Sequence, residues 1–577
     1  MGKNKPFFEA VEHFTIKNLL NYSAEKYSNN TAFVKKVVEE GEKKYKNITY
    51  SELKKDVDAF GNKIASEKME DRRIAVIGNN SYEWAVVFLS CPSGISLTIP
   101  LDKGLTKEEL ESCLIRSKAD TIVFDKSVLE NVEFVKENKQ TFLKKYICID
   151  KTENYEYFYD YIDEGNRLFK EGKDYFTNVE VDPDKLAILL FTSGTTSKSK
   201  AVMLTNRNLT SNVYAMNLVE DIKQTDVNLA FIPYHHAFGC TAILVFLSCG
   251  AKTAFCDGLR HIPENLREYK VTVFVCVPLL IETMYKKVEK EVARQGKTKL
   301  IKTMRKVCNC LEKVGIKIRR KIFKPIIDNL GGHLRLFIVG AAPLDKKVAI
   351  AFNELGIETV QGYGLTETAP VIAAENFKRK RAGSCGFPML NDEIKIINKN
   401  DEGIGEITVK GPNVMLGYYE DEEKTKEVLK DGWFHTGDLG YIDKEGYLFI
   451  TGRKKDVIVL KNGKNVYPDE IECLINGIEG IKENMVFGFE QDDDLVVTAK
   501  VVYDEEVVKE KYPNSTIKEL EKVFWEKIKE VNKKLPTYKY VKKMILTKDS
   551  LIKTTTAKVK RNIEIAKTMK EEKKKNK

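Results

Sequence analysis

A run of small hydroxyl residues closed by two lysines follows an apolar run in the first half of the chain. The apolar run, Leu186–Phe191, is too short for a typical helix and ends at hydroxyl residues and a glycine, which is typical of a buried strand that leads into a loop. Gly194 lets the backbone curl. The side chains that could hold the oxygens of a polyphosphate are Thr192, Ser193, Thr195, Thr196, Lys198 and Lys200. The stretch therefore predicts a phosphate-binding loop.

Two further segments could hold a purine nucleotide. The first has little side-chain bulk, so a flat ring such as adenine could approach its backbone; it consists of Gly340, Ala341, Ala342 and Pro343. In the second, Tyr363 could stack on the ring, while Thr366 and Glu367 could reach an α-phosphate and Mg²⁺, a cation that prefers oxygen ligands. The nucleotide-contacting residues predicted in the second segment are Gln361, Gly362, Tyr363, Gly364 and Thr366. A tight turn after a strand explains either segment equally well when it is taken alone.

The phosphate-loop motif resembles that of the adenylate-forming enzymes, the superfamily of acyl-CoA synthetases, luciferases and nonribosomal adenylation domains. The common P-loop spacing, G-x-x-x-x-G-K-[ST], is excluded because it requires glycine at the position of Ser199. The family's adenine loop and its Y-G-x-T-E motif are similar to Gly340–Pro343 and Tyr363–Glu367, and they follow in the family's order. Where members commonly carry Gly, Pro and Gly, the chain has Ser197, Ser199 and Ala201. We therefore expect a stiffer loop or a different grip on pyrophosphate.

The resemblance implies roles for three residues that follow these motifs. Asp438 resembles the family aspartate that accepts hydrogen bonds from the ribose hydroxyls, and Arg453 resembles the arginine that joins it there. Lys455 matches the hinge about which a small C-terminal domain rotates between two half-reactions. An exposed surface lysine is the simpler interpretation of Lys455. Thr195 and Glu367 are the expected ligands of Mg²⁺.

A pair of adjacent histidines marks the expected acid-binding pocket. In Pro233–Gly239, His236 resembles the family residue at the pocket mouth near the substrate carboxylate, with Phe238 and Gly239 lining the pocket. A structural histidine beside the core is the alternative. Adenylation domains for amino acids place an aspartate in this region to pair with the α-ammonium group, and this segment has no acidic residue. A carboxylic acid without an amino group is therefore the favoured substrate.

Two lysine-bearing loops near the C-terminus complete the resemblance. Lys558 resembles the family's catalytic lysine, although Ala557 stands where the family usually has glycine. A cation that bridges the carboxylate and the α-phosphate would offset the repulsion between two anions and stabilise the transition state. A solvated basic face is the alternative for this loop, and Lys560 is a second candidate for the role. In the thiol-transfer state, Gly463 and Lys464 would face the pantetheine arm of coenzyme A.

The elements that position these motifs alternate between strands and helices. Buried strands are predicted at residues 73–78, 95–101, 121–124, 271–278 and 334–343. This alternation predicts an α/β fold, with mainly parallel sheets in a large N-terminal domain at 1–454. Short strands with Gly and Asn-Asp turns predict a small β-rich subdomain at about 383–454. A small mobile α+β C-terminal domain is expected at 455–565, followed by a disordered basic tail at 566–577.

The composition is ordinary for a soluble protein in a reducing compartment. The length of 577 residues predicts more than one domain. The 11 cysteines are scattered and contain no C-x-x-C, so neither a disulfide framework nor a zinc site is predicted. The first residues lack the apolar region of a signal peptide, and Pro6 stands where a myristoylation signal needs Ser or Thr. The longest apolar run, Thr241–Cys249, is far short of the roughly 20 residues that span a bilayer. We expect a cytoplasmic protein.

Positive charge is concentrated in one segment. Residues 285–325 contain 15 Lys and Arg against three Glu, an excess larger than the net charge of +10 of the whole chain. Spacings of four and three residues within this segment predict one amphipathic helix with an apolar stripe of Leu300, Met304, Val307, Leu311, Val314 and Ile318, and glycines 296 and 315 bracket it. Packing of the stripe on the domain core is the simpler interpretation. Peripheral contact with the inner face of an anionic membrane is the other.

Taken together, the motifs resemble a long-chain fatty acid–CoA ligase, and the segments Gly78–Trp84 and Ile99–Asp102 are similar to that branch. The resemblance implies that a carboxylate and Mg-ATP give an acyl-adenylate and pyrophosphate, and that coenzyme A then takes the acyl group and AMP leaves. An enzyme that uses an acyl carrier protein as acceptor and an aryl-CoA ligase are the alternatives. A non-catalytic basic protein that binds membranes or nucleic acid would leave the nucleotide motifs unexplained. We therefore expect no nucleic-acid partner.

Overall fold

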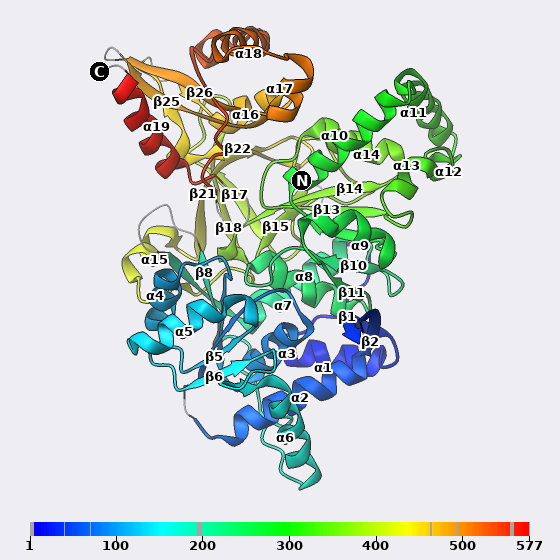
Figure 1. The fold of residues 1–577 in the computed structure, drawn as a ribbon, viewed down its shortest axis with the longest axis vertical. Helices are drawn as coiled ribbons and strands as arrows, with labels where there is room; N and C mark the ends of the chain where they lie inside the picture. Colours follow the sequence, from blue (N-terminus) through cyan, green and yellow to red (C-terminus); the bar gives the residue numbers. More distant parts are fainter. Residues whose placement is uncertain are drawn as a thin grey trace.

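The computed structural model describes residues 5–39, 41–69, 71–192, 199–461, 464–491, 494–553 and 559–575. Within these residues the chain forms two large sheets, a smaller antiparallel sheet, a short hairpin and a three-stranded sheet near the C-terminus (Figure 1). No helix of the described part is both long enough and apolar enough to cross a membrane.

The first large sheet carries the predicted phosphate loop. Its strands, in spatial order, are β19 (Gly417–Tyr418), β9 (Lys200–Thr205), β8 (Leu186–Thr192), β4 (Leu97–Leu101), β3 (Arg73–Ile77), β5 (Thr121–Phe124), β6 (Lys145–Cys148) and β7 (Glu156–Tyr157). The strands from β8 to β7 run parallel, whereas β9 and β19 are antiparallel to their neighbours. Ile74 and Val76 face one hydrophobic cluster, while Ala75 and Ile77 face another. Because both faces of β3 are buried, its sequence is an uninterrupted apolar run.

The second large sheet carries the two predicted nucleotide segments. Its strands, in spatial order, are β16 (Phe387–Pro388), β15 (Val371–Ala374), β14 (Glu358–Gly364), β13 (Leu336–Val339), β12 (Val273–Cys276), β10 (Val227–Ala230), β11 (Lys252–Phe255), β1 (Thr31–Glu39) and β2 (Glu42–Thr49). The strands from β14 to β1 are parallel. Parallel strands end at a common edge, so the loops after β10 and β13 and the end of β14 meet there. The predicted α/β fold with mainly parallel sheets is confirmed.

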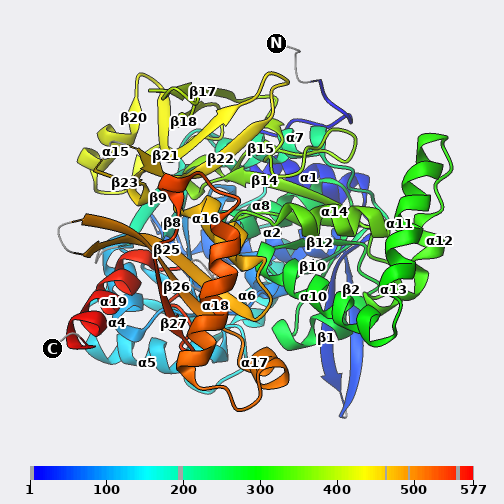
Figure 2. The ribbon, with the colours of Figure 1, turned by 90° about the horizontal axis from the view of Figure 1, so that it is seen from above.

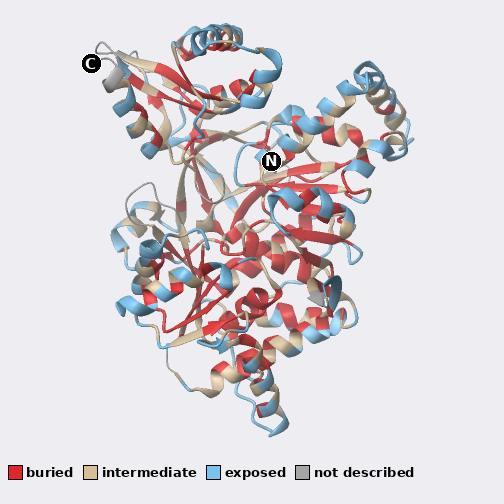
Figure 3. Cartoon of the chain, in the orientation of Figure 1, coloured by how far each residue is buried: buried red, intermediate tan, exposed pale blue. Residues whose placement is uncertain are grey.

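Helices form three layers around the two sheets. The middle layer shares one hydrophobic cluster with both sheets; it contains α1 (Ile16–Lys26), α2 (Tyr50–Ser66), α3 (Tyr82–Ser90), α7 (Asn206–Val219) and α8 (Ala237–Ser248), with α6 (Phe158–Lys170) packed on α2. The outer face of the first sheet is covered by α4 (Lys107–Ser117) and α5 (Leu129–Asn138). The outer face of the second is covered by α9 (Ile262–Glu268), α10 (Pro278–Arg294), α11 (Thr298–Lys313), α13 (Lys324–Asn329) and α14 (Lys346–Leu355). Figure 3 shows the sheets and the middle helices as the most buried part.

Two smaller β structures follow the second large sheet. An antiparallel sheet contains β17 (Glu393–Ile397), β18 (Gly405–Lys410), β21 (Trp433–Ile442), β20 (Leu429–Lys430) and β22 (Leu448–Arg453), with α15 (Glu422–Val428) beside it. The C-terminal sheet contains β25 (Ile481–Gln491), β26 (Asp494–Tyr503) and β27 (Lys543–Thr547). One face of that sheet packs on α16 (Pro468–Asn476), α17 (Glu505–Lys511) and α18 (Ile517–Asn532), which gives the C-terminal region a hydrophobic core of its own.

The prediction of a disordered tail at 566–577 is wrong for most of its length. Helix α19 (Arg561–Lys575) covers the second face of the C-terminal sheet, and Ile565 and Met569 pack there. The buried Lys500 ammonium donates hydrogen bonds to Glu564 Oε1 at 2.8 Å and Thr568 Oγ1 at 2.9 Å. The lysine-rich composition concealed the helix because its few packing residues lie on one side. A buried partner on β26, rather than local hydrophobicity, anchors it.

The predicted single helix over the basic segment is also wrong. Helix α11 ends at Lys313, Gly315 adopts φ +85°, and a separate helix, α12 (Arg319–Ile322), follows. The predicted apolar stripe divides: Met304 and Leu311 are half-buried, whereas Leu300, Val307 and Val314 are exposed. A left-handed glycine ends the helix because that backbone conformation is costly for other residues.

Candidate active site

The ends of β8 and β9 frame the predicted phosphate loop. Thr192 lies opposite Lys200 in the antiparallel register, and the Thr192 hydroxyl donates to the Lys200 carbonyl at 3.4 Å. Arg116 of α4 donates to the carbonyl oxygen of Ser199 at 2.7 Å and holds the far end of the loop. The predicted loop residues Ser193, Gly194, Thr195, Thr196 and Lys198 lie outside the described residues. The two strands and Arg116 therefore fix where this loop begins and ends.

Tyr418 connects the phosphate-loop lysine to the predicted metal ligand. The Lys200 ammonium lies 4.4 Å from the centroid of the Tyr418 ring and donates to its hydroxyl at 3.2 Å. That hydroxyl donates to Glu367 Oε1 at 2.8 Å. Burial raises the pKa of Tyr418, and the neighbouring Glu367 carboxylate raises it further, so the phenol stays protonated and donates. Two motifs far apart in the sequence thus meet at one side chain.

The register of the two-residue strand β19 produces this meeting. Gly417 pairs with Met203 and Tyr418 with Val202 of β9. The loop before β19 is also tied to the Thr366–Thr368 turn, since the Met415 amide donates to the Glu367 carbonyl at 2.9 Å. Nothing in the local sequence around Tyr418 distinguishes it from a core aromatic residue, and sequence reasoning missed it.

The predicted adenine loop lies beside the predicted acyl pocket. After β13, Ala341, Ala342 and Pro343 are exposed, and Ala341 has φ +74°, an uncommon conformation for a residue other than glycine. A Cβ atom at Gly340 would lie 3.2 Å from the ring of Phe238 on α8. The ring of Phe238 therefore packs directly on the backbone of Gly340. The loop for a nucleotide and the pocket for an acid share this contact.

Gln361 on β14 holds the adenine loop against the start of the β-rich subdomain. Its Oε1 accepts from the Leu344 amide at 3.2 Å, and its Nε2 donates to the Ser384 carbonyl at 3.4 Å. The backbone N–H of Gln361 donates to Glu375 Oε2 at 3.2 Å, and burial raises the pKa of Glu375 to about 7. Gln361 thus has a positioning contact in addition to its predicted place in the nucleotide site.

The predicted ribose and adenine residues form one hydrogen-bonded chain. Asp438 on β21 pairs in register with Arg453 on β22, and Arg453 Nε lies 3.2 Å from Asp438 Oδ1. The Tyr363 hydroxyl donates to Asp438 Oδ2 at 2.7 Å. The Asp438 carboxylate raises the pKa of Arg453. Burial is the main cause that raises the pKa of Tyr363, and the Asp438 carboxylate raises it further. The sequence interval between the aspartate and the arginine is therefore the length of one β-hairpin.

The end of β14 must turn sharply after Tyr363. A Cβ atom at Gly364 would lie 1.7 Å from the Pro370 carbonyl oxygen, so only glycine fits there. Gly362 has more room, with its nearest neighbour, the Ala373 carbonyl oxygen, 3.6 Å from a Cβ atom. The turn carries Thr366 and Glu367 in a short 3₁₀ helix directly after the strand. The Y-G-x-T-E spacing therefore has a steric basis in this chain.

Asn80 fixes the histidine loop that precedes α8. Its Nδ2 donates to the carbonyls of Ala230 at 3.2 Å and Ile232 at 2.9 Å, and its Oδ1 accepts from the Tyr234 amide at 2.9 Å. A Cβ atom at Gly239 would lie 2.1 Å from the Pro233 carbonyl oxygen, so the loop folds tightly onto the first turn of α8. His236 occupies the N-cap position of that helix and is half-buried.

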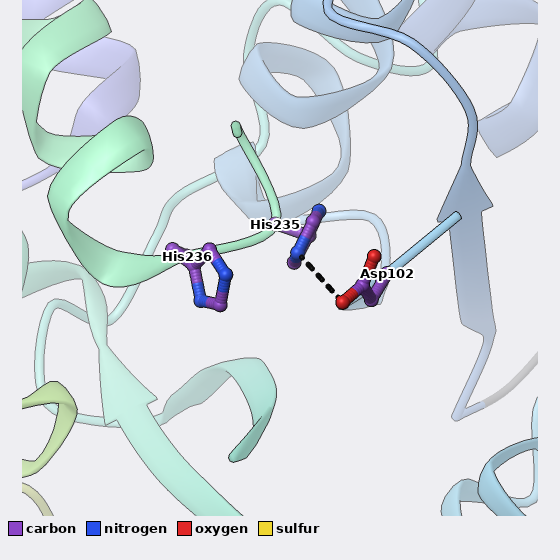
Figure 4. Close-up of side chains that lie close together, drawn as sticks. All are labelled: Asp102, His235 and His236. Atoms are coloured by element: carbon purple, nitrogen blue, oxygen red, sulfur yellow. Dashed lines mark ion pairs between the residues drawn. The ribbon is translucent and has the colours of Figure 1, made fainter. Parts of the chain in front are cut away.

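His235 and Asp102, which the sequence did not single out as site residues, lie beside His236 (Figure 4). His235 Nε2 lies 3.4 Å from Asp102 Oδ2, and the two histidine rings are 4.3 Å apart between centroids. Asp102 follows the end of β4, and its other oxygen accepts from the Gly104 amide at 2.8 Å. The ligand atoms of all three side chains lie within 4.8 Å of one another. The end of β4 therefore brings a carboxylate next to this histidine pair.

The predicted hinge and the predicted coenzyme A loop lie where the C-terminal region begins. Lys455 is exposed in a 3₁₀ turn, and the preceding Lys454 pairs with Glu406 at 2.9 Å. A hairpin of β23 (Ile458–Val459) and β24 (Asn465–Val466) follows. The Lys464 ammonium lies 4.6 Å from the centroid of the Tyr538 ring. Gly463 lies outside the described residues.

The predicted catalytic lysine, Lys558, also lies outside the described residues. The chain on either side of it is held, because Lys553 and Val559 form a β-bridge and Lys553 pairs with Glu483 at 2.8 Å. The backbone N–H of the alternative candidate, Lys560, donates a hydrogen bond to the Ile552 carbonyl oxygen at 2.8 Å. The assignment of the lysine stays a prediction.

Glu367 meets the chemical requirement for the predicted Mg²⁺ ligand. Its carboxylate is half-buried at the end of the Y-G-x-T-E turn and accepts one hydrogen bond through Oε1 from Tyr418. Oxygen ligands of this kind suit Mg²⁺, which usually completes its octahedron with water and substrate phosphates. The second predicted ligand, Thr195, lies outside the described residues. The residues present therefore fit the ion.

Comparison with known proteins identifies the family. A model for AMP-binding enzymes matches residues 20–419, and one for the C-terminal domain of AMP-binding enzymes matches 455–572. Long-chain-fatty-acid–CoA ligase 5 of Rattus norvegicus is 31% identical over 77% of this chain and 69% of its own length. A chloroplastic long-chain-fatty-acid–[acyl-carrier-protein] ligase, AEE15 of Arabidopsis thaliana, is 27% identical over 82% of this chain and 74% of its own.

A solved structure matches over nearly the whole chain. ATP-bound MatB from Rhodopseudomonas palustris superposes with a TM-score of 0.72 at 26% identity, covering 95% of this chain and 98% of that one. A similarity of this extent is that of a shared fold. The chain therefore belongs to the AMP-binding enzyme family, in the adenylate-forming superfamily and its long-chain acyl-CoA synthetase branch.

Proposed function

We propose that this protein activates a long-chain fatty acid with ATP and transfers the acyl group to coenzyme A. The observation that carries the proposal is the convergence of the nucleotide motifs. Lys200, Tyr418 and Glu367 form one chain of contacts, and Tyr363, Asp438 and Arg453 form another. An ordered set of such groups in a recognised family is a strong basis for assigning a site.

In the first half-reaction, a carboxylate oxygen of the fatty acid attacks the α-phosphorus of ATP. The new bond joins that oxygen to phosphorus, and the bond between the α-phosphorus and the bridging oxygen breaks, so pyrophosphate leaves with the electron pair. We assign the adenine to the Gly340–Pro343 loop and Tyr363, and the ribose to Asp438 and Arg453. Lys558 would offset the repulsion between the two anions as they meet.

The phosphate groups would lie between the loop after β8 and the Thr366–Glu367 turn. Mg²⁺, held by Glu367 and Thr195, would neutralise phosphate charge when it is bound. Lys200 presents a second cation on the same side, and its contact with the Tyr418 ring keeps its side chain extended toward Glu367. The chain's own contribution is to orient the polyphosphate and to hold cationic groups around it.

In the second half-reaction, the sulfur of coenzyme A attacks the carbonyl carbon of the acyl-adenylate. A carbon–sulfur bond forms, the bond from that carbon to the phosphate oxygen breaks, and AMP leaves, while the thiol proton passes to water. We propose that the C-terminal domain rotates about Lys455 between the two steps, so that Gly463 and Lys464 face the pantetheine arm. One cleft would then serve both reactions in turn.

Two features support a fatty acid as the substrate. Phe238 packs on Gly340, so an apolar ring borders the space next to the nucleotide loop. The histidine segment Pro233–Gly239 contains no acid of its own, and the Asp102 carboxylate beside it lies 3.4 Å from His235 Nε2, so that this oxygen is directed at a histidine. Relatives named as long-chain-fatty-acid–CoA ligases support a long chain, and the relative named as an acyl-carrier-protein ligase supports a carrier protein as the alternative acceptor.

The test is pyrophosphate exchange across a panel of fatty, aromatic and amino acids. We expect exchange with fatty acids of long chain, weaker exchange with aromatic acids and none with amino acids. Thioester formation is then compared with coenzyme A and with an acyl carrier protein. If exchange with benzoate exceeds exchange with palmitate, the protein is an aryl-CoA ligase and the proposed substrate is wrong. If product forms only with the carrier protein, the acceptor is the carrier protein and not coenzyme A.

A further inference from the structure

A basic arm stands at the margin of the N-terminal domain; it consists of α11, the following turn and α12, residues 298–322. Figures 1 and 2 both show α11 at the edge of the molecule, away from the C-terminal sheet. None of the residues that we assign to the nucleotide, the acid or coenzyme A lies within residues 298–322. The arm therefore calls for a role of its own.

One side of the arm is fixed to the core. Cys308 is buried, and Ile301 and Met304 pack against the hydrophobic cluster that contains α14. Arg305 pairs with Glu354 of α14, and Arg319 pairs with Glu312 within the arm. Met304 of the predicted stripe is therefore packed on the core, and the charges of Arg305 and Arg319 are paired with carboxylates. These contacts also hold the arm in one orientation.

A second side of the arm presents apolar residues to solvent. Leu300, Val307 and Val314 follow one another at intervals of seven residues, or two helical turns, and are 51%, 41% and 71% exposed. Ile316, in the turn before α12, is 47% exposed. Single exposed apolar residues are ordinary, but several gathered along one arm form the kind of patch that serves as an interaction site.

Lysines border that row. Lys299, Lys302, Lys306, Lys313 and Lys317 are all exposed, and none forms an ion pair with any residue that the structure describes. The neighbouring Arg320 is also exposed, but its guanidinium donates hydrogen bonds to the carbonyls of Leu334 and Gly356. At 3.6 residues per turn, Lys299 and Lys306 lie about 100° from Leu300 and Val307, on the side opposite the packed Ile301 and Cys308. Ammonium groups therefore border the apolar row on its solvent side.

We propose that this face of the basic arm binds the surface of an anionic lipid bilayer. Lipid headgroups supply phosphate for the five lysines, and the acyl boundary beneath them accepts Leu300, Val307 and Ile316. A nucleic-acid backbone would pair with the lysines but would leave the apolar row in water. The proposal goes beyond the proposed reaction, because binding is measured without ATP, acid or coenzyme A.

The experiment is co-sedimentation with vesicles of equal parts phosphatidylglycerol and phosphatidylcholine, at low and high salt. The full chain is compared with a variant that carries Lys→Gln at 299, 302, 306, 313 and 317, all exposed positions where substitution has little effect on folding. We expect native protein to pellet at low salt and not at high salt. The variant's partition coefficient should be lower by about a hundredfold to a thousandfold.

Two further variants separate charge pattern from total charge. A matched control carries Lys→Gln at 55, 144, 151, 170 and 185, which are exposed lysines of the N-terminal half. It loses the same charge and should pellet with most of the native affinity. A third variant, with Leu300, Val307 and Ile316 changed to Ser, keeps every charge and should bind at least about tenfold more weakly, by the area of apolar surface that it removes.

Three outcomes would overturn the proposal. They are native protein that stays in the supernatant at low salt, equal pelleting on vesicles of pure phosphatidylcholine, and equal loss of binding in the arm and control variants. Pyrophosphate exchange with a long-chain fatty acid carried on serum albumin, without vesicles, is measured on every variant in parallel. Loss of exchange would concern the proposed reaction, whereas loss of pelleting alone concerns the arm.

Discussion

The Tyr418 side chain contacts both Lys200, at the end of the predicted phosphate loop, and Glu367, in the turn after β14. Its ring faces the Lys200 ammonium, and its hydroxyl donates to Glu367. A single residue thereby limits where a cation and a carboxylate lie relative to each other. Asp438 has a similar position between Tyr363 and Arg453. Both residues orient groups that we assign to the nucleotide, so their removal should affect ATP more than the acid.

Replacing Tyr418 with Phe removes the hydroxyl and keeps the ring over Lys200. A hydrogen bond to a charged group contributes about 1.5–3 kcal/mol, so we expect kcat/KM for ATP to fall about tenfold to a hundredfold. The KM for the fatty acid should change little. Tyr419→Phe is the matched control, because the Tyr419 hydroxyl accepts from Arg73 at 2.8 Å and its ring packs against a different hydrophobic cluster from that of Tyr418. Equal losses in both variants would contradict the role of Tyr418.

Replacing Lys558 with Ala should slow adenylate formation at least about a hundredfold, because a cation no longer bridges the carboxylate and the α-phosphate. Thioester formation from a supplied acyl-adenylate should remain largely intact, since that step has no such meeting of anions. The two half-reactions are measured separately by pyrophosphate exchange and by release of AMP. Lys560→Ala is the control, and a larger loss there than in Lys558→Ala would transfer the assignment to Lys560.

At the scale of elements, the turn after β22 carries the mechanical role that we propose for the protein. β22 ends at Arg453, whose side chain pairs with Asp438, and the chain enters a short 3₁₀ turn that contains Lys455. The last residue of that turn, Asp456, pairs with Arg561 at the start of α19. The two ends of the turn are thus bound to different parts of the molecule. Rotation between those parts requires backbone freedom within the turn.

Lys455→Pro should slow thioester formation much more than adenylation, because proline fixes φ near −65°. Lys455→Ala removes the same charge but leaves the backbone free, so it is the matched control. We expect a loss of at least about tenfold in the second half-reaction for the proline variant and nearly normal rates for the alanine variant. Similar losses in both half-reactions, or in both variants, would show that Lys455 contributes charge rather than a hinge.

At the scale of the whole molecule, several carboxyl groups are buried in the core rather than paired at the surface. Burial raises the pKa of Glu220 to about 8, with neighbouring carboxylates adding to the effect, and burial alone raises that of Asp392 to about 8. Asp392 accepts one hydrogen bond from Asn413 at 3.0 Å. Such groups keep their protons in the folded state at pH values where the unfolded chain has lost them. The contribution of these groups to the stability of the fold is therefore largest at acidic pH and falls as the pH rises toward about 8.

Asp392→Asn tests this linkage. In the native chain the contribution of Asp392 is fully present below its unfolded pKa of about 4 and is lost as the pH rises toward about 8, with a slope of at most about 1.4 kcal/mol per pH unit. The variant cannot ionise, so its free energy of unfolding should fall less steeply over that interval and exceed that of the native chain at about pH 8. Urea unfolding at several pH values measures this. Parallel curves for the two proteins would contradict the assignment.

The sequence by itself determined parallel strands of each large sheet, namely β3, β4, β5 and β8 of the first and β12 and β13 of the second. It also singled out Tyr363, Asp438 and Arg453, which the structure brings together. Those features are local: an apolar run followed by Gly, Ser and Thr marks a strand end wherever the strand lies in the sheet. The spacing of Asp438 and Arg453 likewise reflects one hairpin, which needs no distant partner. The α/β fold and the family were predictable for this reason.

Only the tertiary structure decided the features that depend on distant partners. The register of β19 on β9 brings Tyr418 to Glu367, and the end of β4 brings Asp102 to His235. A buried lysine on β26 anchors α19, which the local composition had marked as disordered. Each of these contacts joins segments far apart in the chain, and neither spacing nor periodicity records which segments will meet. Long-range packing, rather than local preference, determines them.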